Sequence, residues 1–151
     1  MVVYYSRTGA TAKIAKEISR ELKCDIEEVH DRKSRKGILR WFVAGRDGTL
    51  KRTTIIEKTV HDPSVYDLVV IGTPLWVNTT PAIRTYLKEN ADKFKEVAFF
   101  CTMGGSSGKN AFEEMSQITG KKPIAVMDIR NDEVMNANYR HALQEFISKL
   151  K

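Results

Sequence analysis

The sequence predicts a three-layer α/β/α fold built on a doubly wound, five-stranded parallel sheet of strand order 2-1-3-4-5. Short apolar, β-branched runs alternate along the chain with stretches of helical periodicity, which favours a sheet covered by helices. Most of these runs are apolar on both faces, as in strands buried on both sides. Five such strands joined by right-handed crossovers suit this order. A chain of 151 residues, 42% of them apolar, suits one domain over residues 1–151.

The predicted strands and helices alternate with one exception. The expected strands are Val2 to Tyr5, Cys24 to Val29, Asp67 to Gly72, Val97 to Cys101 and Pro123 to Ile129, the second being more polar and therefore placed at an edge. Four helices are expected. The first runs from Thr11 to Lys23, and the second begins at Pro81 with Thr80 as its N-cap. The other two are indicated by their apolar residues, which are Phe112, Met115 and Ile118 in the third and Tyr139, Leu143, Phe146, Ile147 and Leu150 in the fourth.

The exception is a long excursion over about residues 31–62, which stands in place of a full second helix. It contains a short apolar patch, enough for two helical turns, consisting of Ile38, Leu39, Trp41, Phe42 and Val43. From Arg32 to Arg52 there are eight basic residues and one acid, Asp47, so eight minus one gives this segment +7, whereas the whole chain carries +6. Such a segment is expected to dock an acidic partner or to form a solvated face. No motif supports nucleic acid binding.

Composition excludes several other classes of protein. No apolar run approaches the ~20 residues that span a bilayer. The first residues lack the basic region of a signal peptide, so a cytoplasmic location is expected. Cys24 and Cys101 form no C-x-x-C pair and no ligand cluster with the three histidines, so no metal site is predicted. Both cysteines are interpreted as small buried apolar residues.

Three polar segments follow the first, third and fourth predicted strands, where open parallel sheets bind their ligands. The first segment, Ser6 to Thr11, brings hydroxyls, a glycine and backbone N–H groups to a helix N-terminus. The helix dipole there favours an anion such as a phosphate. The alternative interpretation is an ordinary helix cap rich in serine and threonine.

Each of the other two segments can also be interpreted either as a ligand-binding loop or as an ordinary structural element. The second, Gly72 to Pro81, places Trp76 on a loop as a flat surface for a flat ligand, or as an anchor in the core. The third, Thr102 to Gly108, is rich in glycine and serine, which let a backbone approach a ligand or form a flexible turn. It is not a nucleotide P-loop, because Met103 stands at the leading glycine and Asn110 at the magnesium-binding position. The chain contains no G-x-G-x-x-G dinucleotide fingerprint.

Together the three segments resemble the flavodoxin family, and the resemblance covers nearly the whole chain. The family's phosphate loop, [ST]-x-T-G-x-T, is matched by Ser6, Thr8, Gly9 and Thr11, its G-[ST]-P-x-[WY] loop by Gly72 to Trp76, and its glycine-rich loop by Thr102 to Gly108. The resemblance implies one FMN, with its phosphate on the first loop, Trp76 against the isoalloxazine and the Met103 to Gly105 backbone at the pyrimidine edge. The implied cofactor-binding residues are Ser6, Arg7, Thr8, Gly9, Ala10, Thr11, Thr73, Pro74, Leu75, Trp76, Thr102, Met103, Gly104, Gly105, Ser106 and Gly108. No catalytic residue and no metal ligand is implied.

Several departures from the family pattern bear on the site. Ala10 stands where the family often has asparagine, which removes one phosphate contact. The third loop has no second aromatic residue, so the opposite flavin face is open or is covered by Trp41 or Phe42. The fifth strand has no insertion, which indicates the short-chain type. The fold separates Cys24 and Cys101 by roughly 14 Å, too far for a disulfide, and a redox role for Cys101 beside the flavin is the alternative to core packing.

The resemblance implies a one-electron carrier that shuttles electrons between redox partners, because no general acid, base or nucleophile stands in the three loops. The alternative is an FMN-dependent oxidoreductase, either a quinone reductase or a protoporphyrinogen dehydrogenase-like enzyme, with the excursion as its substrate pocket or lid. A signalling module without flavin is the third hypothesis. A phosphate receiver would require an aspartate at the end of the third strand, where this chain has Gly72 and Thr73.

The expected partner is an acidic redox protein that docks on the basic segment from Arg32 to Arg52 of a monomer or weak dimer. Positive charges near a reduced, anionic flavin are expected to raise its second reduction potential. Neutralising Arg40 and Arg46 should then lower that potential, and added salt should reduce the difference.

Overall fold

The computed structural model describes residues 1–32, 53–75, 78–105 and 107–151. In chain order the elements are β1 (Val2–Tyr4), α1 (Ala10–Leu22), β2 (Ile26–Glu28), a short 3-10 helix (Pro63–Val65), β3 (Leu68–Leu75), α3 (Pro81–Glu89), β4 (Glu96–Met103), α4 (Lys109–Thr119), β5 (Val126–Arg130), α5 (Asn131–Met135) and α6 (Arg140–Ser148). Each of the five strands and four helices predicted outside the excursion is present, and the 3-10 helix and α5 are additional.

The five strands form one parallel sheet of order β2-β1-β3-β4-β5, which confirms the predicted fold class. The polar strand β2 is at an edge, as expected. Val3 is in register with Ile71, and Ile71 with Phe99, so apolar side chains line up across the centre of the sheet. This register gives both faces of the central strands apolar residues that must be covered.

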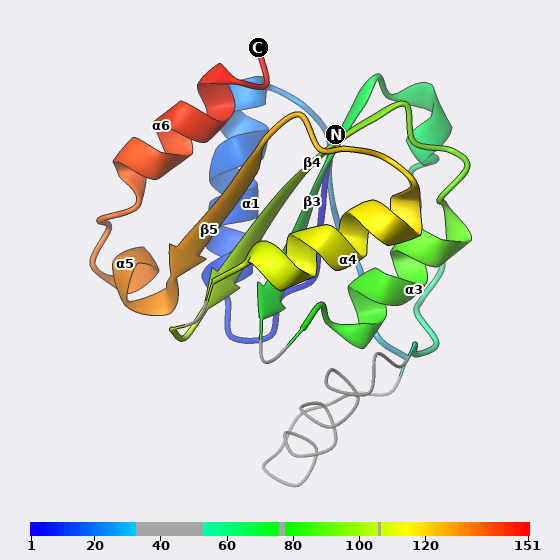
Figure 1. Cartoon of the computed structure of the whole chain (residues 1–151), viewed down its shortest axis with the longest axis horizontal. Coiled ribbons are helices and arrows are strands. Elements are labelled where there is room, and N and C mark those ends of the chain that lie inside the picture. Colours follow the sequence, from blue (N-terminus) through cyan, green and yellow to red (C-terminus); the bar gives the residue numbers. More distant parts are fainter. Residues whose placement is uncertain (33–52, 76–77, 106) are drawn as a thin grey trace, which may run out of the picture.

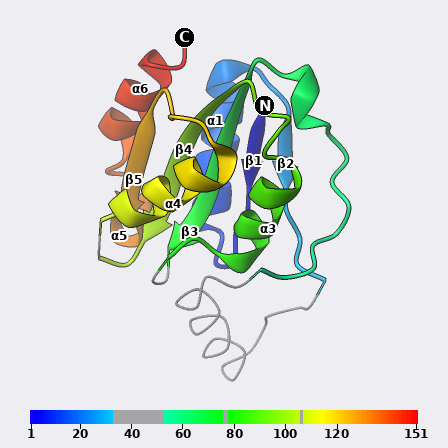
Figure 2. The same cartoon turned by 45° about the vertical axis from the view of Figure 1, so that its right-hand side comes forward.

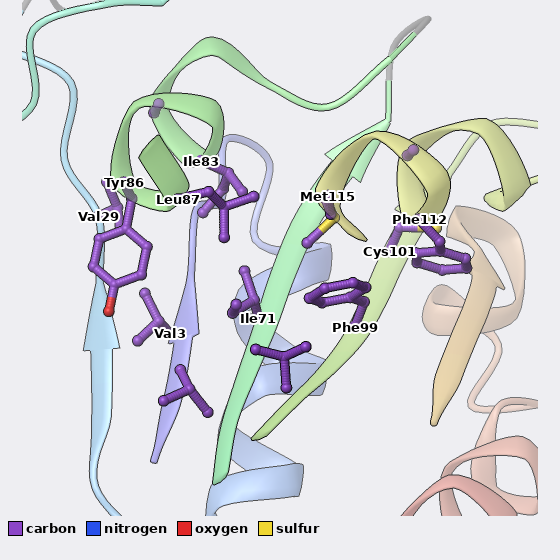
Figure 3. Packing of buried hydrophobic residues seen from close by; sticks show 14 of the residues in the cluster. Val3, Val29, Ile71, Ile83, Tyr86, Leu87, Phe99, Cys101, Phe112 and Met115 are labelled. Atoms are coloured by element: carbon purple, nitrogen blue, oxygen red, sulfur yellow. The ribbon is translucent and has the colours of Figure 1, made fainter. Parts of the chain in front are cut away.

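Helices cover the sheet on both faces, as Figures 1 and 2 show. On one face α3 and α4 pack on a buried cluster that includes Val3, Ile71 and Phe99, seen from close by in Figure 3. On the other face α1, α5 and α6 pack on a second cluster that includes Val70 and Phe100. The predicted apolar side of α1 is confirmed, because Ile14, Ala15 and Ile18 are all buried in this second cluster.

Two central strands extend beyond their predicted ends. β3 continues past Gly72 to Leu75, and β4 continues past Cys101 to Met103, because the two strands remain paired along these residues. β1 ends opposite Gly72, so Pro74 has a neighbouring strand on one side only and is tolerated as it would be in an edge strand. The second and third polar segments therefore begin within the sheet.

The two ends of the excursion lie together. Asp31 and Ile56 form an antiparallel bridge, and Arg32 donates its N–H to the Ile55 carbonyl oxygen at 3.0 Å. The predicted helical turns, with Trp41, Phe42 and most of the basic residues, lie outside the described residues. Across the described ranges, no helix is both long and apolar enough to cross a membrane.

Candidate functional site at the carboxyl edge of the sheet

Three loops emerge side by side at one edge of the sheet. β1, β3 and β4 are neighbours and parallel, with Tyr4 opposite Gly72 and Leu75 opposite Met103. The carboxyl ends of these strands lie at one end of the molecule in Figure 1. The loops after Tyr4, Leu75 and Met103 therefore meet where a doubly wound sheet reverses its strand order, the usual position of a ligand in such folds.

The first loop, which we call the phosphate loop (residues 6–11), is held in shape by its own serine. Ser6 Oγ accepts hydrogen bonds from the N–H groups of Gly9 and Ala12, each at 3.2 Å. Gly9 has φ +96°, a conformation that favours glycine. Because a hydroxyl has one donor as well as two acceptor positions, Ser6 keeps its own proton to donate to a ligand.

The phosphate loop presents backbone donors at the start of α1. The helical hydrogen bonds begin with Lys13 N–H to the Gly9 carbonyl oxygen at 2.9 Å. Within the described ranges, the N–H groups of Thr8, Ala10 and Thr11 have no acceptor. Thr8 is exposed and Arg7 half-buried beside these groups. Free N–H groups at a helix N-terminus, together with a hydroxyl, form the donor set of an anion site.

A buried hydrogen bond joins the phosphate loop to β4. Thr11 Oγ1 and Thr102 Oγ1 lie 2.7 Å apart, and each residue is 1% exposed. β3 lies between β1 and β4 in the sheet, so this bond links the first and third loops across the middle one. The hydroxyl of Thr102, predicted as a cofactor contact, is thus bonded to Thr11, and its role toward the cofactor stays a prediction.

The glycine-rich loop (residues 102–108) has two parts with different environments. Gly104 and Gly105 are exposed, and a Cβ at either would meet no described residue within 4 Å. Gly108 is buried at the N-cap of α4, and its N–H donates to Asp128 Oδ2 at 3.0 Å. A Cβ at Gly108 would lie 2.7 Å from Cys101 Sγ. The first two glycines are therefore open to a ligand, whereas Gly108 packs on the core.

The second loop is closed at its base by two threonines. Thr73 Oγ1 and Thr80 Oγ1 are 3.0 Å apart, and the Thr80 N–H donates to Thr73 Oγ1 at 3.4 Å. Thr73, Pro74 and Leu75 are the last residues of β3, with Thr73 and Leu75 buried. Trp76 in this loop and Ser106 in the glycine-rich loop lie outside the described residues. Their predicted roles stay predictions.

Cys101 lies in the core below these loops. It is 0% exposed, and burial, followed by the negative charge of Asp128, raises the pKa of its thiol well above the ordinary value. Cys24 and Cys101 are both free. A protonated, buried thiol is a poor nucleophile and a poor redox group. Among the described residues, no group of three or more histidine, cysteine, aspartate or glutamate side chains could hold a metal ion.

Sequence reasoning did not identify two charged residues behind the second loop. Arg84 in α3 and Glu114 in α4 form a buried ion pair, with 2.9 Å between Nε and Oε1. The predicted apolar face of α3 was Ile83, Tyr86 and Leu87, but every residue from Pro81 to Leu87 is buried. The sequence of α3 does not indicate that Arg84 is buried, because the partner that makes its burial possible, Glu114, lies in another helix.

Comparisons with known proteins agree with this geometry. The family model described as flavodoxin matches residues 1–150. A flavoprotein from Lactobacillus acidophilus NCFM in complex with FMN is 26% identical, with 90% of this chain and 95% of that chain covered and a TM-score of 0.74. Two-electron reduced flavodoxin from Megasphaera elsdenii shares the fold at 22% identity, 99% coverage of both chains and a TM-score of 0.58.

An NADH:FMN oxidoreductase, solved in its apo form, also shares the fold, at 15% identity, with 97% of this chain and 87% of that chain covered and a TM-score of 0.51. A search of curated proteins returns no match. Because the family model matches residues 1–150 and the sheet has the predicted strand order, the chain belongs to the flavodoxin family of FMN-binding flavoproteins.

Proposed function

We propose that this protein binds one FMN at the carboxyl edge of the sheet and carries electrons between redox partners. The observation that supports this most strongly is the meeting of an anion-binding turn and two exposed glycines on neighbouring strands. The three loops contain hydroxyls, glycines and one arginine, but no aspartate, glutamate, histidine, lysine or cysteine. Such loops suit binding and positioning better than acid–base or nucleophilic chemistry.

The residues present fit the two ends of FMN. An anionic phosphate requires several donors, and the N–H groups of Thr8, Ala10 and Thr11 lie together without protein acceptors in the described structure. A flat ring system requires a backbone that can approach closely, and Gly104 and Gly105 leave that space. The site therefore fits a phosphate at α1 and a planar group toward β3 and β4.

In this proposal the phosphate loop provides most of the binding free energy. The backbone N–H groups, with the hydroxyls of Ser6 and Thr8, donate to the phosphate, and each such charged bond is worth roughly 1.5–3 kcal/mol. The backbone of Met103 to Gly105 orients the ring, with Trp76 as its stacking surface. When bound, FMN supplies reversible one- and two-electron transfer, and the protein supplies binding and electrostatics.

Two measurements test this function. Apo protein titrated with FMN should quench flavin fluorescence at one site per chain, and riboflavin, which lacks the phosphate, should bind more weakly. Anaerobic stepwise reduction followed by the visible spectrum should show two separate one-electron steps. Failure to bind FMN would refute the proposal, and reduction in a single two-electron step would favour an enzyme over a carrier.

The second candidate is an FMN-dependent oxidoreductase. The observation in its favour is that the end of the excursion is hydrogen-bonded to α3, next to the second loop. The Thr54 N–H donates to Thr85 Oγ1 at 3.0 Å, and Thr85 Oγ1 donates to the Thr54 carbonyl oxygen at 2.8 Å. The excursion therefore returns beside the first turns of α3, directly after the second loop. Steady reduction of a quinone by NAD(P)H without a partner protein would support this candidate, and its absence would favour the carrier.

The carrier proposal includes a redox partner protein. We expect that partner to be acidic and to dock on the basic segment from Arg32 to Arg52, in the cytoplasm and with this chain as a monomer or weak dimer. Binding that weakens steeply between low and physiological salt would support charge-driven docking. Binding that is independent of salt would contradict it.

A further inference from the structure

α3 and α4 are joined by an ion pair that is almost fully buried. The side chains of Arg84 and Glu114 are 1% and 8% exposed. Arg84 Nε donates to Glu114 Oε1 at 2.9 Å, and Arg84 Nη2 donates to Glu114 Oε2 at 3.3 Å. The two planar groups thus meet with two parallel hydrogen bonds, which restricts their relative orientation.

The same guanidinium group holds the second loop. Arg84 Nη2 also donates to the backbone carbonyl oxygen of Thr79 at 2.8 Å. Thr79 is 0% exposed and lies three residues after Trp76. Because a guanidinium is rigid and presents its donors in a fixed fork, it ties the position of the Thr79 carbonyl to that of Glu114.

Glu114 in turn belongs to the helix that follows the glycine-rich loop. α4 begins at Lys109, directly after Gly108, and Glu114 lies in its second turn. The contacts from Thr79 through Arg84 to Glu114 therefore connect the loop after β3 with the helix after the glycine-rich loop. The loop after β3 and the glycine-rich loop are the two that the proposed function places against the flavin ring.

The energetics of burial indicate a role other than stability. Removing two charges from water is costly, and a well-packed apolar pair of similar volume is often at least as stable as a buried ion pair. An apolar pair, however, could not donate to the Thr79 carbonyl oxygen. We propose that Arg84 and Glu114 are positioning residues that hold residues 78–80 of the second loop against α4 in the geometry required by the flavin, an inference that rests on the proposed function.

Two single variants separate positioning from stability. Glu114→Gln keeps one oxygen acceptor for Arg84 and leaves the Arg84 bond to Thr79 in place, whereas Arg84→Lys keeps the charge but loses the fork. Both should lower the urea midpoint of the apo protein. Only Arg84→Lys should raise the FMN dissociation constant, by about tenfold, as for loss of a buried hydrogen bond. If the FMN dissociation constants of the two variants follow their stabilities, the proposal is overturned.

A double variant gives the sharper comparison. Arg84→Met with Glu114→Leu should recover the urea midpoint lost in Arg84→Lys, because no unpaired charge remains, yet FMN binding should stay weakened. Parental FMN affinity in this folded double variant would refute the positioning role. Met115→Leu, a similar-volume change at the next residue of α4, is the matched control and should leave FMN affinity unchanged.

A readout without flavin keeps this test distinct from the test of function. The Thr80 amide, which donates to Thr73 Oγ1, should exchange with solvent faster in apo Arg84→Lys than in apo Glu114→Gln, while amides within α4 exchange alike. If Thr80 exchanges faster in Arg84→Lys but the parental protein binds no FMN, the proposed function is refuted and the loop-positioning role is still supported. Equal Thr80 exchange in the two variants would overturn the positioning role itself.

Discussion

The phosphate loop and the glycine-rich loop resemble each other in composition but are built differently. Gly9 in the phosphate loop adopts φ +96°, so glycine is required there by backbone shape. In the glycine-rich loop, Gly104 and Gly105 have neither a positive φ nor a close neighbour among the residues that the structure describes, whereas Gly108 is packed against Cys101 and Phe112. The comparison separates three reasons for glycine: backbone conformation, packing, and space left open for a ligand.

The largest effect should come from the packed glycine. Gly108→Ala places a Cβ 2.7 Å from Cys101 Sγ and 2.8 Å from the Phe112 ring, and should lower the free energy of unfolding by about 2–3 kcal/mol. Urea unfolding of the apo protein measures this. Adding Cys101→Ala should recover part of the loss, and a Gly108→Ala protein of parental stability would show that the packing argument is wrong.

The next effect should come from the contact between the two loops. Thr102→Val leaves the buried Thr11 hydroxyl without its partner and should destabilise the protein by about 1–2 kcal/mol. Thr102→Ser keeps that hydrogen bond and should lose only the packing of one buried methyl group. Because Thr11 belongs to the phosphate loop, Thr102→Val should weaken binding of FMN more than that of riboflavin. Equal weakening of both ligands would place Thr102 at the ring rather than behind the phosphate.

A smaller effect, confined to binding, should distinguish the open glycines. Gly104→Ala and Gly105→Ala should each change stability by less than about 0.5 kcal/mol, since both sites are exposed and uncrowded. FMN should nevertheless bind about fivefold more weakly if the ring approaches this backbone, as measured by fluorescence quenching. Unchanged affinity in both variants would remove the reason for placing the ring there.

The smallest effect concerns the thiol beneath the glycine-rich loop. Since burial keeps the Cys101 pKa well above its ordinary value, this thiol stays protonated at pH 8. Iodoacetamide should therefore modify the half-buried Cys24 of the native protein but spare Cys101, and should modify both in urea, as mass spectrometry can show. Cys101→Ser should leave the flavin reduction potential unchanged. A shifted potential would restore the redox hypothesis.

Much of the fold could be predicted because its signals are local. Continuous apolar runs and 3.6-residue periodicity identified the five strands and the four long helices of the described structure. Their alternation favoured the observed strand order. The 3-10 helix and α5 were not predicted. α5 is only five residues long, and its start depends on a bond from the Arg130 N–H to Glu133 Oε2 at 2.8 Å. The predicted ends of β3 and β4 were too early, because the two strands stay paired with each other as far as Leu75 and Met103.

The fold class, the family and the positions of three loops at one edge of the sheet could be predicted from the sequence alone, since each follows from residue order and local spacing. The way in which the polar groups of those loops are paired depends on the tertiary structure. The tertiary structure paired Thr11 with Thr102, Thr73 with Thr80 and Arg84 with Glu114, and it turned Gly108 toward the core. These contacts join residues from different elements, and their distances are set by how helices pack on the sheet rather than by any pattern along the chain.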